Sequence, residues 1–123
     1  MEIKSYFFDT YALYELIQGN PNYADYQKVN IITTRLNLME LHYGLLRVYG
    51  QEKAEEFFNL FREFCIEIND EIVKEANELK LKLKKRRLSY IDCIGYIVSN
   101  RLGIKFLTGD KEFSDLENVE FVK

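Results

Sequence analysis

The stretch SYIDCIGYIVSNRLGIKFLTGD, residues 89–110, contains a complete helix-then-strand unit. A serine that suits a helix N-cap and a glycine that suits a helix end frame an amphipathic pattern, which predicts a helix over residues 90–102. The apolar residues 104–107 then predict a buried strand. Two aspartates accompany this unit, Asp92 in the first turn of the helix and Asp110 just past the strand. The interpretation of the whole chain depends on where these two carboxylates lie.

The same alternation of strand and helix runs through the rest of the chain. Short runs rich in β-branched and aromatic residues predict further strands at 3–8, 29–34, 65–68 and 119–122. Helical spacing of apolar residues predicts helices at 11–18, 36–49, 51–63 and 70–86. Because parallel strands need crossover connections, this order predicts a mainly parallel sheet with helices on both faces, a three-layer α/β/α sandwich.

Size and composition favour a single domain over residues 1–123. Hydrophobic residues make up 47% and charged residues 30%, which is ordinary for a globular protein, and nothing divides the chain by composition. No apolar run approaches about 18 residues and no signal-peptide pattern is present, so we expect no membrane association. Cys65 and Cys93 belong to no CxxC pair, which fits a reducing cytoplasm better than a disulfide framework or a zinc site.

Acidic residues accompany the ends of several predicted strands. Asp9 and Asp110 directly follow strands, and Glu40 lies early in a helix that leaves a strand. We expect these three at the carboxyl edge of the sheet, where ligands of parallel sheets bind. Asp92 begins a helix that leads into a strand, which we place at the opposite edge unless the preceding helix and loop bring it back. The topology alone therefore leaves the position of Asp92 open.

Three blocks of the sequence resemble the signature of PIN domains, most closely that of the VapC-type toxin ribonucleases. The blocks are YFFDTYAL (6–13), LNLMELHYGLL (36–46) and YIDCIGYIVSNRLGIKFLTGDKEF (90–113). The family pattern is an apolar strand ending in Asp-Ser/Thr, a helical Glu before an aromatic-Gly pair, an Asp beginning a helix, and a strand followed by Thr-x-Asp with a nearby Phe. The matching residues are Asp9, Thr10, Glu40, Tyr43, Gly44, Asp92, Thr108, Asp110 and Phe113.

The resemblance implies a PIN-like α/β/α sandwich in which the four acids converge, Asp92 included. It implies Mg²⁺- or Mn²⁺-dependent cleavage of RNA phosphodiester bonds by the toxin of a type II toxin–antitoxin pair. It also implies a homodimer, and an antitoxin that inserts a peptide near the active site. Residues 20–28 match nothing in the family pattern.

The chemistry of clustered carboxylates fits that activity. Two carboxylates about 4 Å apart repel each other by about 4 kcal/mol at an effective dielectric near 20, so a cluster is reasonable where hard divalent cations occupy it. Such cations activate water and stabilise the leaving oxygen. We expect four catalytic residues and metal ligands, Asp9, Glu40, Asp92 and Asp110, of which Glu40 binds a second cation or orients the attacking water. We expect two supporting hydroxyls that contact metal-bound water or phosphate, Thr10 and Thr108.

Residues 80–87, KLKLKKRR, form a basic run with six cationic side chains. The net charge of −3 argues against RNA binding through bulk charge, but the chain without the four acids carries +1 and does not oppose a polyanion. The run is either a track for RNA phosphates or a solvated helix end favoured by the helix dipole. The candidate phosphate contacts are Lys82, Lys84, Lys85, Arg86 and Arg87.

Structural interpretations and other functions also remain open. Ser89 and Asp92 match a capping box, Glu40 alone is typical of a solvated helix residue, and Asp110 suits a turn. A non-catalytic PIN-fold module that binds RNA or a protein partner is the main alternative to a nuclease. A different α/β phosphotransfer domain, such as a receiver or a phosphatase, is a further one, although no DxDxT motif follows the first strand.

Overall fold

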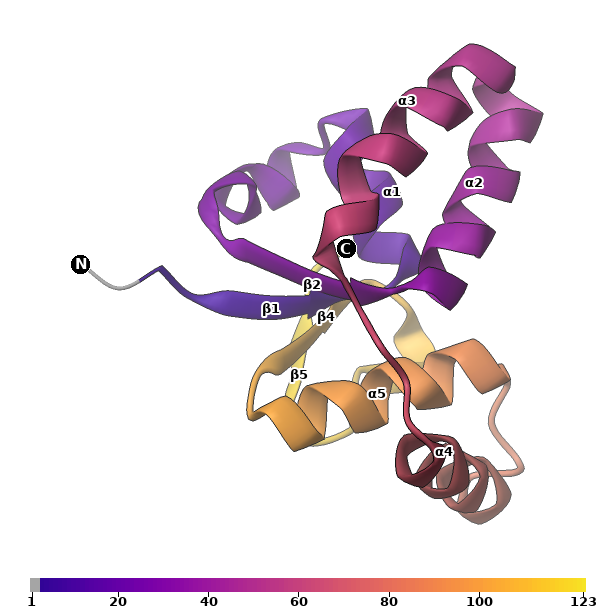
Figure 1. The fold of residues 1–123 in the computed structure, drawn as a ribbon. Helices are drawn as coiled ribbons and strands as arrows, with labels where there is room; N and C mark the ends of the chain where they lie inside the picture. Colours follow the sequence, from indigo (N-terminus) through magenta and orange to yellow (C-terminus); the bar gives the residue numbers. More distant parts are fainter. Residues whose placement is uncertain (1–2) are drawn as a thin grey trace.

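The computed structural model describes residues 3–123 and contains a five-stranded sheet between two layers of helices (Figure 1). The strand order is β3-β2-β1-β4-β5, and the described strand pairs are all parallel. The strands are β1 Ser5–Phe8, β2 Asn30–Thr34, β3 Cys65–Ile66, β4 Lys105–Thr108 and β5 Val119–Phe121. The predicted mainly parallel sheet is confirmed.

The helices divide between the two faces of the sheet, as Figure 1 shows, with α1, α2 and α3 on one face and α4 and α5 on the other. The α-helices are α1 Thr10–Gln18, α2 Arg35–Tyr49, α3 Gln51–Phe61, α4 Asp70–Lys82 and α5 Tyr90–Leu102. Three short 3₁₀ segments complete the fold: η1 Pro21–Lys28, η2 Arg62–Phe64 and η3 Lys111–Phe113. The predicted three-layer α/β/α sandwich is therefore confirmed. No helix in the described part of the chain is long and apolar enough to cross a membrane.

Successive side chains of the central strands β1 and β4 point to opposite faces of the sheet, so each face has its own hydrophobic core. Phe7 and Phe106 lie on the face of α4 and α5, with ring centres 5.6 Å apart. Phe8 and Leu107 lie on the other face, packed against α1 and α2. All four side chains are fully buried. Because burial of each contributes roughly 1.5–3 kcal/mol, β1 and β4 are held from both faces at the centre of the molecule.

The helix predicted over 70–86 is too long, because α4 ends at Lys82. The backbone N–H of Arg86 donates to the carbonyl of Leu83 at 2.9 Å, which closes a turn, and the Nζ of Lys80 donates to the carbonyl of Leu88 at 2.6 Å. Like charges three and four residues apart on a helix repel, so a continued helix would have crowded the basic side chains of residues 80–87. The chain instead turns back towards α5.

The close approach of α5 to the sheet depends on Gly95. A Cβ atom at this position would lie 2.7 Å from the ring of Phe7 and 3.2 Å from the ring of Phe106. Real Cβ atoms do not come that close to a ring carbon, so the packing of this helix on β1 and β4 requires a glycine.

We predict that Gly95→Ala lowers the free energy of unfolding by about 1–3 kcal/mol, because the added methyl overpacks the core against Phe7. Urea unfolding followed by circular dichroism measures this change. Gly44→Ala is the matched control, since a Cβ at Gly44 in α2 meets nothing within 4 Å. Alanine there gains up to about 1 kcal/mol from helix propensity. Equal stability of the two variants would contradict the prediction.

Candidate active site

The carboxyl ends of β1 and β4 form the centre of the site. The chain proceeds from β1 through β2 to β3 on one side, and then crosses to place β4 and β5 on the other side of β1. Ligands of parallel sheets bind at such a switch point, outside the carboxyl ends of the strands. Asp9 follows β1 and Asp110 follows β4, and the backbone N–H of Asp9 donates to the carbonyl of Leu107 at 3.3 Å. These two acids therefore lie at the edge where they were expected.

Asp9 is the most deeply buried of the four acids, with 4% of its surface exposed. Its Oδ1 accepts a hydrogen bond from the backbone N–H of Ala12 at 2.8 Å, which caps α1, and its Oδ2 accepts one from the hydroxyl of Thr108. The pKa of Asp9 is raised to about 7, mainly by burial and in part by the charges of Asp92 and Asp110. The two hydrogen bonds act in the opposite direction and lower it.

Thr108 connects two of the acids. Its hydroxyl donates to Asp9 and accepts from the backbone N–H of Asp110 at 3.0 Å. We had expected Thr108 to contact metal-bound water or phosphate. The side chain is completely buried, however, so it has no surface from which to make that contact. We therefore assign Thr108 a positioning role for Asp9 and Asp110.

Glu40 is held by a second hydroxyl at the start of α1. The hydroxyl of Thr10 donates to Oε1 of Glu40 at 2.7 Å and accepts from the side-chain amide of Asn37 at 3.2 Å. Asn37 in turn accepts from the hydroxyl of Thr34 at 2.6 Å. This chain of hydrogen bonds joins the start of α1 to the first turns of α2 and leaves Glu40 half-buried.

Asn37 is a residue of the site that we did not predict from the sequence. Only 2% of its surface is exposed, and its side chain joins Thr10 to Thr34. A signal was present, because a polar residue directly before Leu38, on the apolar side of a helix and three residues before Glu40, is unusual in a core unless it is hydrogen-bonded.

Asp92 lies at the same edge as the other acids. α5 reaches β4 after a two-residue turn, in which the backbone N–H of Ile104 donates to the carbonyl of Ser99 at 3.0 Å. A helix that turns so tightly into the strand on which it packs must run antiparallel to it, and therefore begins at the carboxyl end of that strand. Our placement of this helix start at the opposite edge was wrong, because it ignored this reversal.

Electrostatics confirms that Asp92 is close to its counterparts. Burial raises the pKa of Asp92, the hydrogen bonds from Ser89 lower it, and the negative charges of Asp110 and Glu40 raise it again. Asp92 and Asp110 act in the same way on Asp9. Asp92 therefore lies within electrostatic range of Asp9, Asp110 and Glu40.

The structural interpretations of two acids are also correct. Ser89 and Asp92 form a capping box, with bonds of 2.9 Å and 3.0 Å, and Oδ1 of Asp110 accepts from the backbone N–H of Glu112 at 3.0 Å. These contacts use one carboxylate oxygen of each acid, Oδ2 of Asp92 and Oδ1 of Asp110. Among the described residues, the second oxygen of Asp92 and of Asp110 receives no hydrogen bond.

The donor chemistry of the site fits a hard divalent cation, but the carboxylates do not form a closed ligand cluster. The donors are oxygens, which Mg²⁺ and Mn²⁺ prefer. Within residues 3–123, no three side chains of His, Cys, Asp or Glu are gathered closely enough to hold a metal ion. Both oxygens of Asp9 are engaged in hydrogen bonds from Thr108 and Ala12. A cation would supply the charge that draws the second oxygens inwards.

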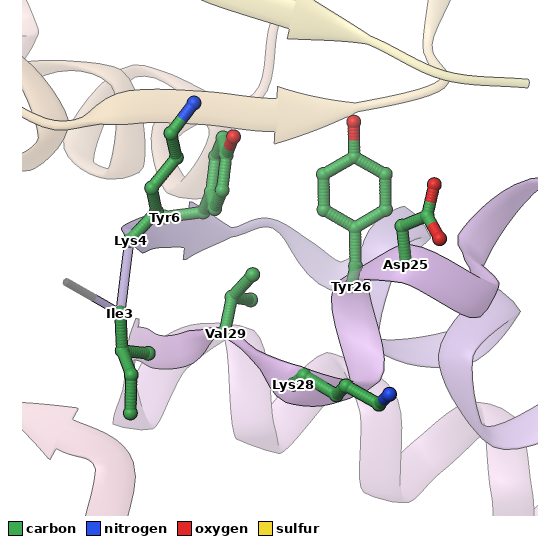
Figure 2. A pocket seen from close by; sticks show the side chains of 7 residues that line it. All are labelled: Ile3, Lys4, Tyr6, Asp25, Tyr26, Lys28 and Val29. Carbon is green, nitrogen blue, oxygen red and sulfur yellow. The ribbon is translucent and has the colours of Figure 1, made fainter. Parts of the chain in front are cut away.

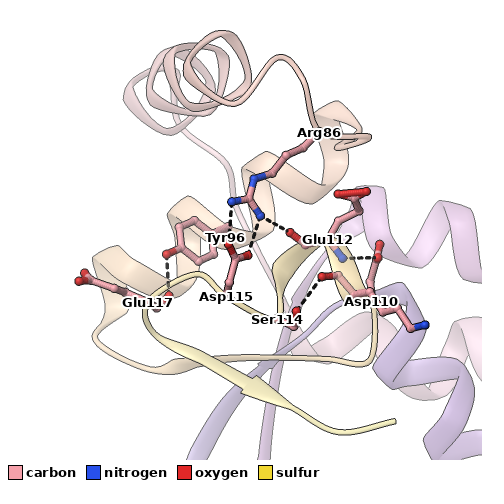
Figure 3. Close-up of polar contacts among 8 residues, drawn as sticks. Arg86, Tyr96, Asp110, Glu112, Ser114, Asp115 and Glu117 are labelled. Carbon is pink, nitrogen blue, oxygen red and sulfur yellow. Dashed lines mark hydrogen bonds and ion pairs between the residues drawn. The ribbon is translucent and has the colours of Figure 1, made fainter.

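The candidate phosphate contacts of the basic run 80–87 differ in their surroundings. Arg86 forms a bidentate ion pair with Asp115, at 2.6 Å and 2.9 Å, and also donates to the carbonyl of Glu112 at 2.9 Å (Figure 3). Its guanidinium is therefore used to hold the connection between β4 and β5, which makes it unsuited to the predicted phosphate contact. The other four candidates are exposed: Lys82, Lys84, Lys85 and Arg87.

A hollow of about 630 Å³ lies at the opposite edge of the sheet (Figure 2). Its lining residues stand at the amino ends of β1 and β2: Ile3, Lys4, Tyr6, Asp25, Tyr26, Lys28 and Val29. It contains a single acid, Asp25, and so lacks the clustered carboxylates of the site. We therefore do not assign the candidate site to this hollow.

Comparison with known proteins identifies the family. The model of the PIN domain family matches residues 6–119, and the chain therefore belongs to this family, as predicted. VapC20 of Mycobacterium tuberculosis, described as a sarcin-ricin loop cleaving toxin, has the same fold at a TM-score of 0.79 and 20% identity, over 96% of this chain and 99% of that one.

Two further solved structures share the fold. A toxin–antitoxin complex from Klebsiella pneumoniae matches with a TM-score of 0.73 and 19% identity, over 93% of this chain and 94% of that one. VapBC2 from Rickettsia felis, bound to a DNA fragment from its promoter, matches with a TM-score of 0.71 and 17% identity, over 97% of this chain and 99% of that one. At these identities the likeness shows the fold. No curated protein sequence gives a significant match.

We predict that the metal-free protein loses stability as the pH rises. The pKa of Asp9 is raised from 3.8 to about 7 by folding, so its stabilising contribution is present below pH 4 and is lost as the pH passes through 7. A shift of this size corresponds to a loss of at most about 4 kcal/mol. Asp9→Asn keeps the helix cap and removes the charge, so it should be more stable than the wild type at pH 8 and not at pH 4.

Urea unfolding in EDTA at pH 4 and pH 8 measures this difference. Asp25→Asn is the control, because Asp25 is exposed at the opposite edge of the sheet. If the stabilities of Asp9→Asn and the wild type differ by the same amount at both pH values, Asp9 is not a buried, destabilising charge.

Proposed function

We propose that this chain is a divalent-cation-dependent endoribonuclease of the VapC type, the toxin of a toxin–antitoxin pair. The observation that carries the proposal is the gathering of acids at the switch point of a PIN domain, where neighbouring carboxylates raise the pKa values of Asp9 and Asp92. Buried carboxylates with raised pKa values destabilise the protein when they ionise, unless a cation compensates their charge. A role in catalysis is therefore the best explanation for this group of destabilising acids.

Asp9, Asp92 and Asp110 would hold Mg²⁺ or Mn²⁺. A bound cation supplies activated water and stabilises charge on the leaving oxygen of the phosphodiester. The carboxyl of Asp9 is kept in one orientation by Thr108 and by the backbone of Ala12, so it does not have to be ordered when the cation arrives. This rigidity is the preorganisation that catalytic sites require.

Glu40 has a separate role in the proposal. Thr10 donates to its Oε1 at 2.7 Å, which fixes the carboxylate and leaves Oε2 to orient the attacking water or to bind a second cation. Asn37 prevents Thr10 from turning away, because its amide donates to the same hydroxyl at 3.2 Å. We therefore place Thr10 and Asn37 as positioning residues for Glu40.

The proposed substrate is RNA and the proposed protein partners are an antitoxin and a second copy of this chain. Solved proteins of the same fold are described as an RNA-loop-cleaving toxin and as toxin–antitoxin complexes. α2, which starts at the acidic edge, exposes apolar side chains that would be covered by such partners: Met39, Tyr43, Leu46 and Val48. We place the antitoxin peptide near the acids and the single domain, residues 1–123, in the cytoplasm.

A non-catalytic PIN-fold module that binds RNA or a partner is the second candidate. The absence of a closed ligand cluster among the described acids favours it. Tight RNA binding that is unaffected by divalent cations, together with undetectable cleavage, would support this alternative. A receiver or a phosphatase receives no support from membership of the PIN family.

We predict that the purified chain cleaves single-stranded RNA in Mg²⁺ or Mn²⁺ and that EDTA abolishes cleavage. Asp9→Asn and Asp92→Asn should each lower the rate on the order of 100-fold or more, because each removes a group that stabilises charge in the transition state. Asp25→Asn, on the opposite edge, should cleave like the wild type. Equal rates for Asp9→Asn and Asp25→Asn would remove the nuclease proposal.

We also predict that Mn²⁺ raises the melting temperature of the wild type at pH 8 but not that of Asp9→Asn. A ligand at 100 times its Kd stabilises a protein by about 2.7 kcal/mol, which is a shift of several degrees. Differential scanning fluorimetry with increasing MnCl₂ measures it. A shift of the same size in both proteins would place the cation elsewhere.

A further inference from the structure

A basic hollow lies beside the acidic site, between the end of α4 and the start of α5. Its volume is about 300 Å³, at the lower end of the range for small-ligand sites. The lining residues are Asn77, Lys80, Leu81, Lys84 and Tyr90, with two cations and no acid. It adjoins the acids because Tyr90 precedes Asp92 by two residues in the first turn of α5.

Tyr90 is an exposed aromatic ring on a rigid support. Its exposed fraction is 65%, although neighbouring Leu88 is only 4% exposed and anchors the chain in the core. The capping box between Ser89 and Asp92 holds the same turn of helix. A ring held in this way loses little entropy when a flat ligand stacks on it.

The lysines of the hollow are arranged around that ring. The Nζ of Lys80 lies 4.9 Å from the ring centre of Tyr90 and donates to the carbonyl of Leu88 at 2.6 Å, so the backbone fixes the cation. Lys84 is exposed in the turn that follows α4. In the described part of the chain, neither lysine forms an ion pair with a carboxylate, whereas Arg86 of the same run is paired with Asp115.

We propose that this hollow binds one nucleotide of single-stranded RNA, with its base stacked on Tyr90 and its phosphate against Lys84 and Lys80. Stacking on aromatic side chains combined with a basic groove is the general way in which proteins hold single strands. A base inside a duplex has no free face for such stacking, so the proposal specifies an unpaired substrate. It rests on the proposed action of this chain on RNA.

The geometry of α5 gives the path of the strand. Residues two apart on a helix are separated by about 3 Å along the axis and by roughly 200° around it. Tyr90 and Asp92 therefore face opposite sides of the first turn, and a strand bound at both passes over the N-terminus of the helix. This end carries partial positive charge and free backbone N–H groups, which favour phosphate.

The test measures binding without cleavage. All variants are made in the Asp9→Asn protein and titrated in EDTA against a fluorescein-labelled oligouridylate, with fluorescence anisotropy as the readout. Tyr90→Ala should weaken binding about tenfold, because a stacked base contributes about 1–3 kcal/mol. Tyr90→Phe keeps the ring and should stay within about twofold of the parent. Tyr49→Ala is the matched control, since Tyr49 is 48% exposed at the far end of α2.

The phosphate contact has its own measurement. Lys84→Ala should weaken binding severalfold and lower the slope of log K against log salt by about 0.7, the value for one phosphate contact on a single strand. Lys53→Ala is its control, because Lys53 is exposed on α3 and also lies over a ring, 6.0 Å from the centre of Phe57.

An abasic probe of the same length separates stacking from charge. If a base occupies the hollow, Tyr90→Ala weakens binding of oligouridylate and leaves binding of the abasic strand unchanged. Equal weakening of both probes, or an equal Kd for Tyr90→Ala and Tyr49→Ala, overturns the proposal and favours an acidic peptide as the occupant.

Failure of this inference is distinguishable from failure of the nuclease proposal. Metal-dependent cleavage that Asp9→Asn abolishes, with no effect of Tyr90→Ala on binding, removes only the nucleotide site. Binding that depends on Tyr90 in a wild type that never cleaves RNA removes the nuclease and keeps the site, as part of a binding module.

Discussion

The parallel pairing of β1 with β4 is the constraint on which the site depends. It places Asp9 next to Thr108, 99 positions later in the sequence, and lets the buried hydroxyl of Thr108 join the carboxyl of Asp9 to the backbone of Asp110. Both strands are held by aromatic and aliphatic side chains on each face, so the carboxyl edge cannot shift without opening two cores. The position of the acids is therefore supported by hydrophobic burial and not by attraction among polar groups.

The energetics of the site oppose those of the fold. Burial raises the pKa of Asp9 and of Asp92, and neighbouring carboxylates raise both further. Hydrogen bonds from Thr108, Ala12 and Ser89 offset part of this cost, since they favour the ionised form. The proposed cation would neutralise the carboxylate charge that these hydrogen bonds do not offset. Within the described residues, hydrogen bonds satisfy both oxygens of Asp9 but only one oxygen each of Glu40, Asp92 and Asp110.

The surroundings of the acids are asymmetric around the first turn of α5. One side carries Asp92 and the other acids, and the other carries Tyr90 with Lys80 and Lys84, which form no ion pair with a carboxylate of residues 3–123. The basic run 80–87 contributes to both structure and surface, because the pairing of Arg86 with Asp115 closes the loop after β4 while its neighbours stay exposed. A polyanion would thus meet positive charge beside, and not within, the group of acids.

The sequence by itself determined the strand and helix order, the parallel sheet, the family and the positions of Asp9, Glu40 and Asp110, because these follow from periodicity, caps and the edge at which parallel strands end. It also contained the position of Asp92, which is recovered once the reversal of α5 into β4 is considered. Only the tertiary structure decided which hydroxyl holds which carboxylate, that Asn37 supports Thr10, and that Arg86 is occupied by Asp115. Such pairings depend on side-chain directions and distances between segments far apart in the chain, and no local pattern of residues encodes them.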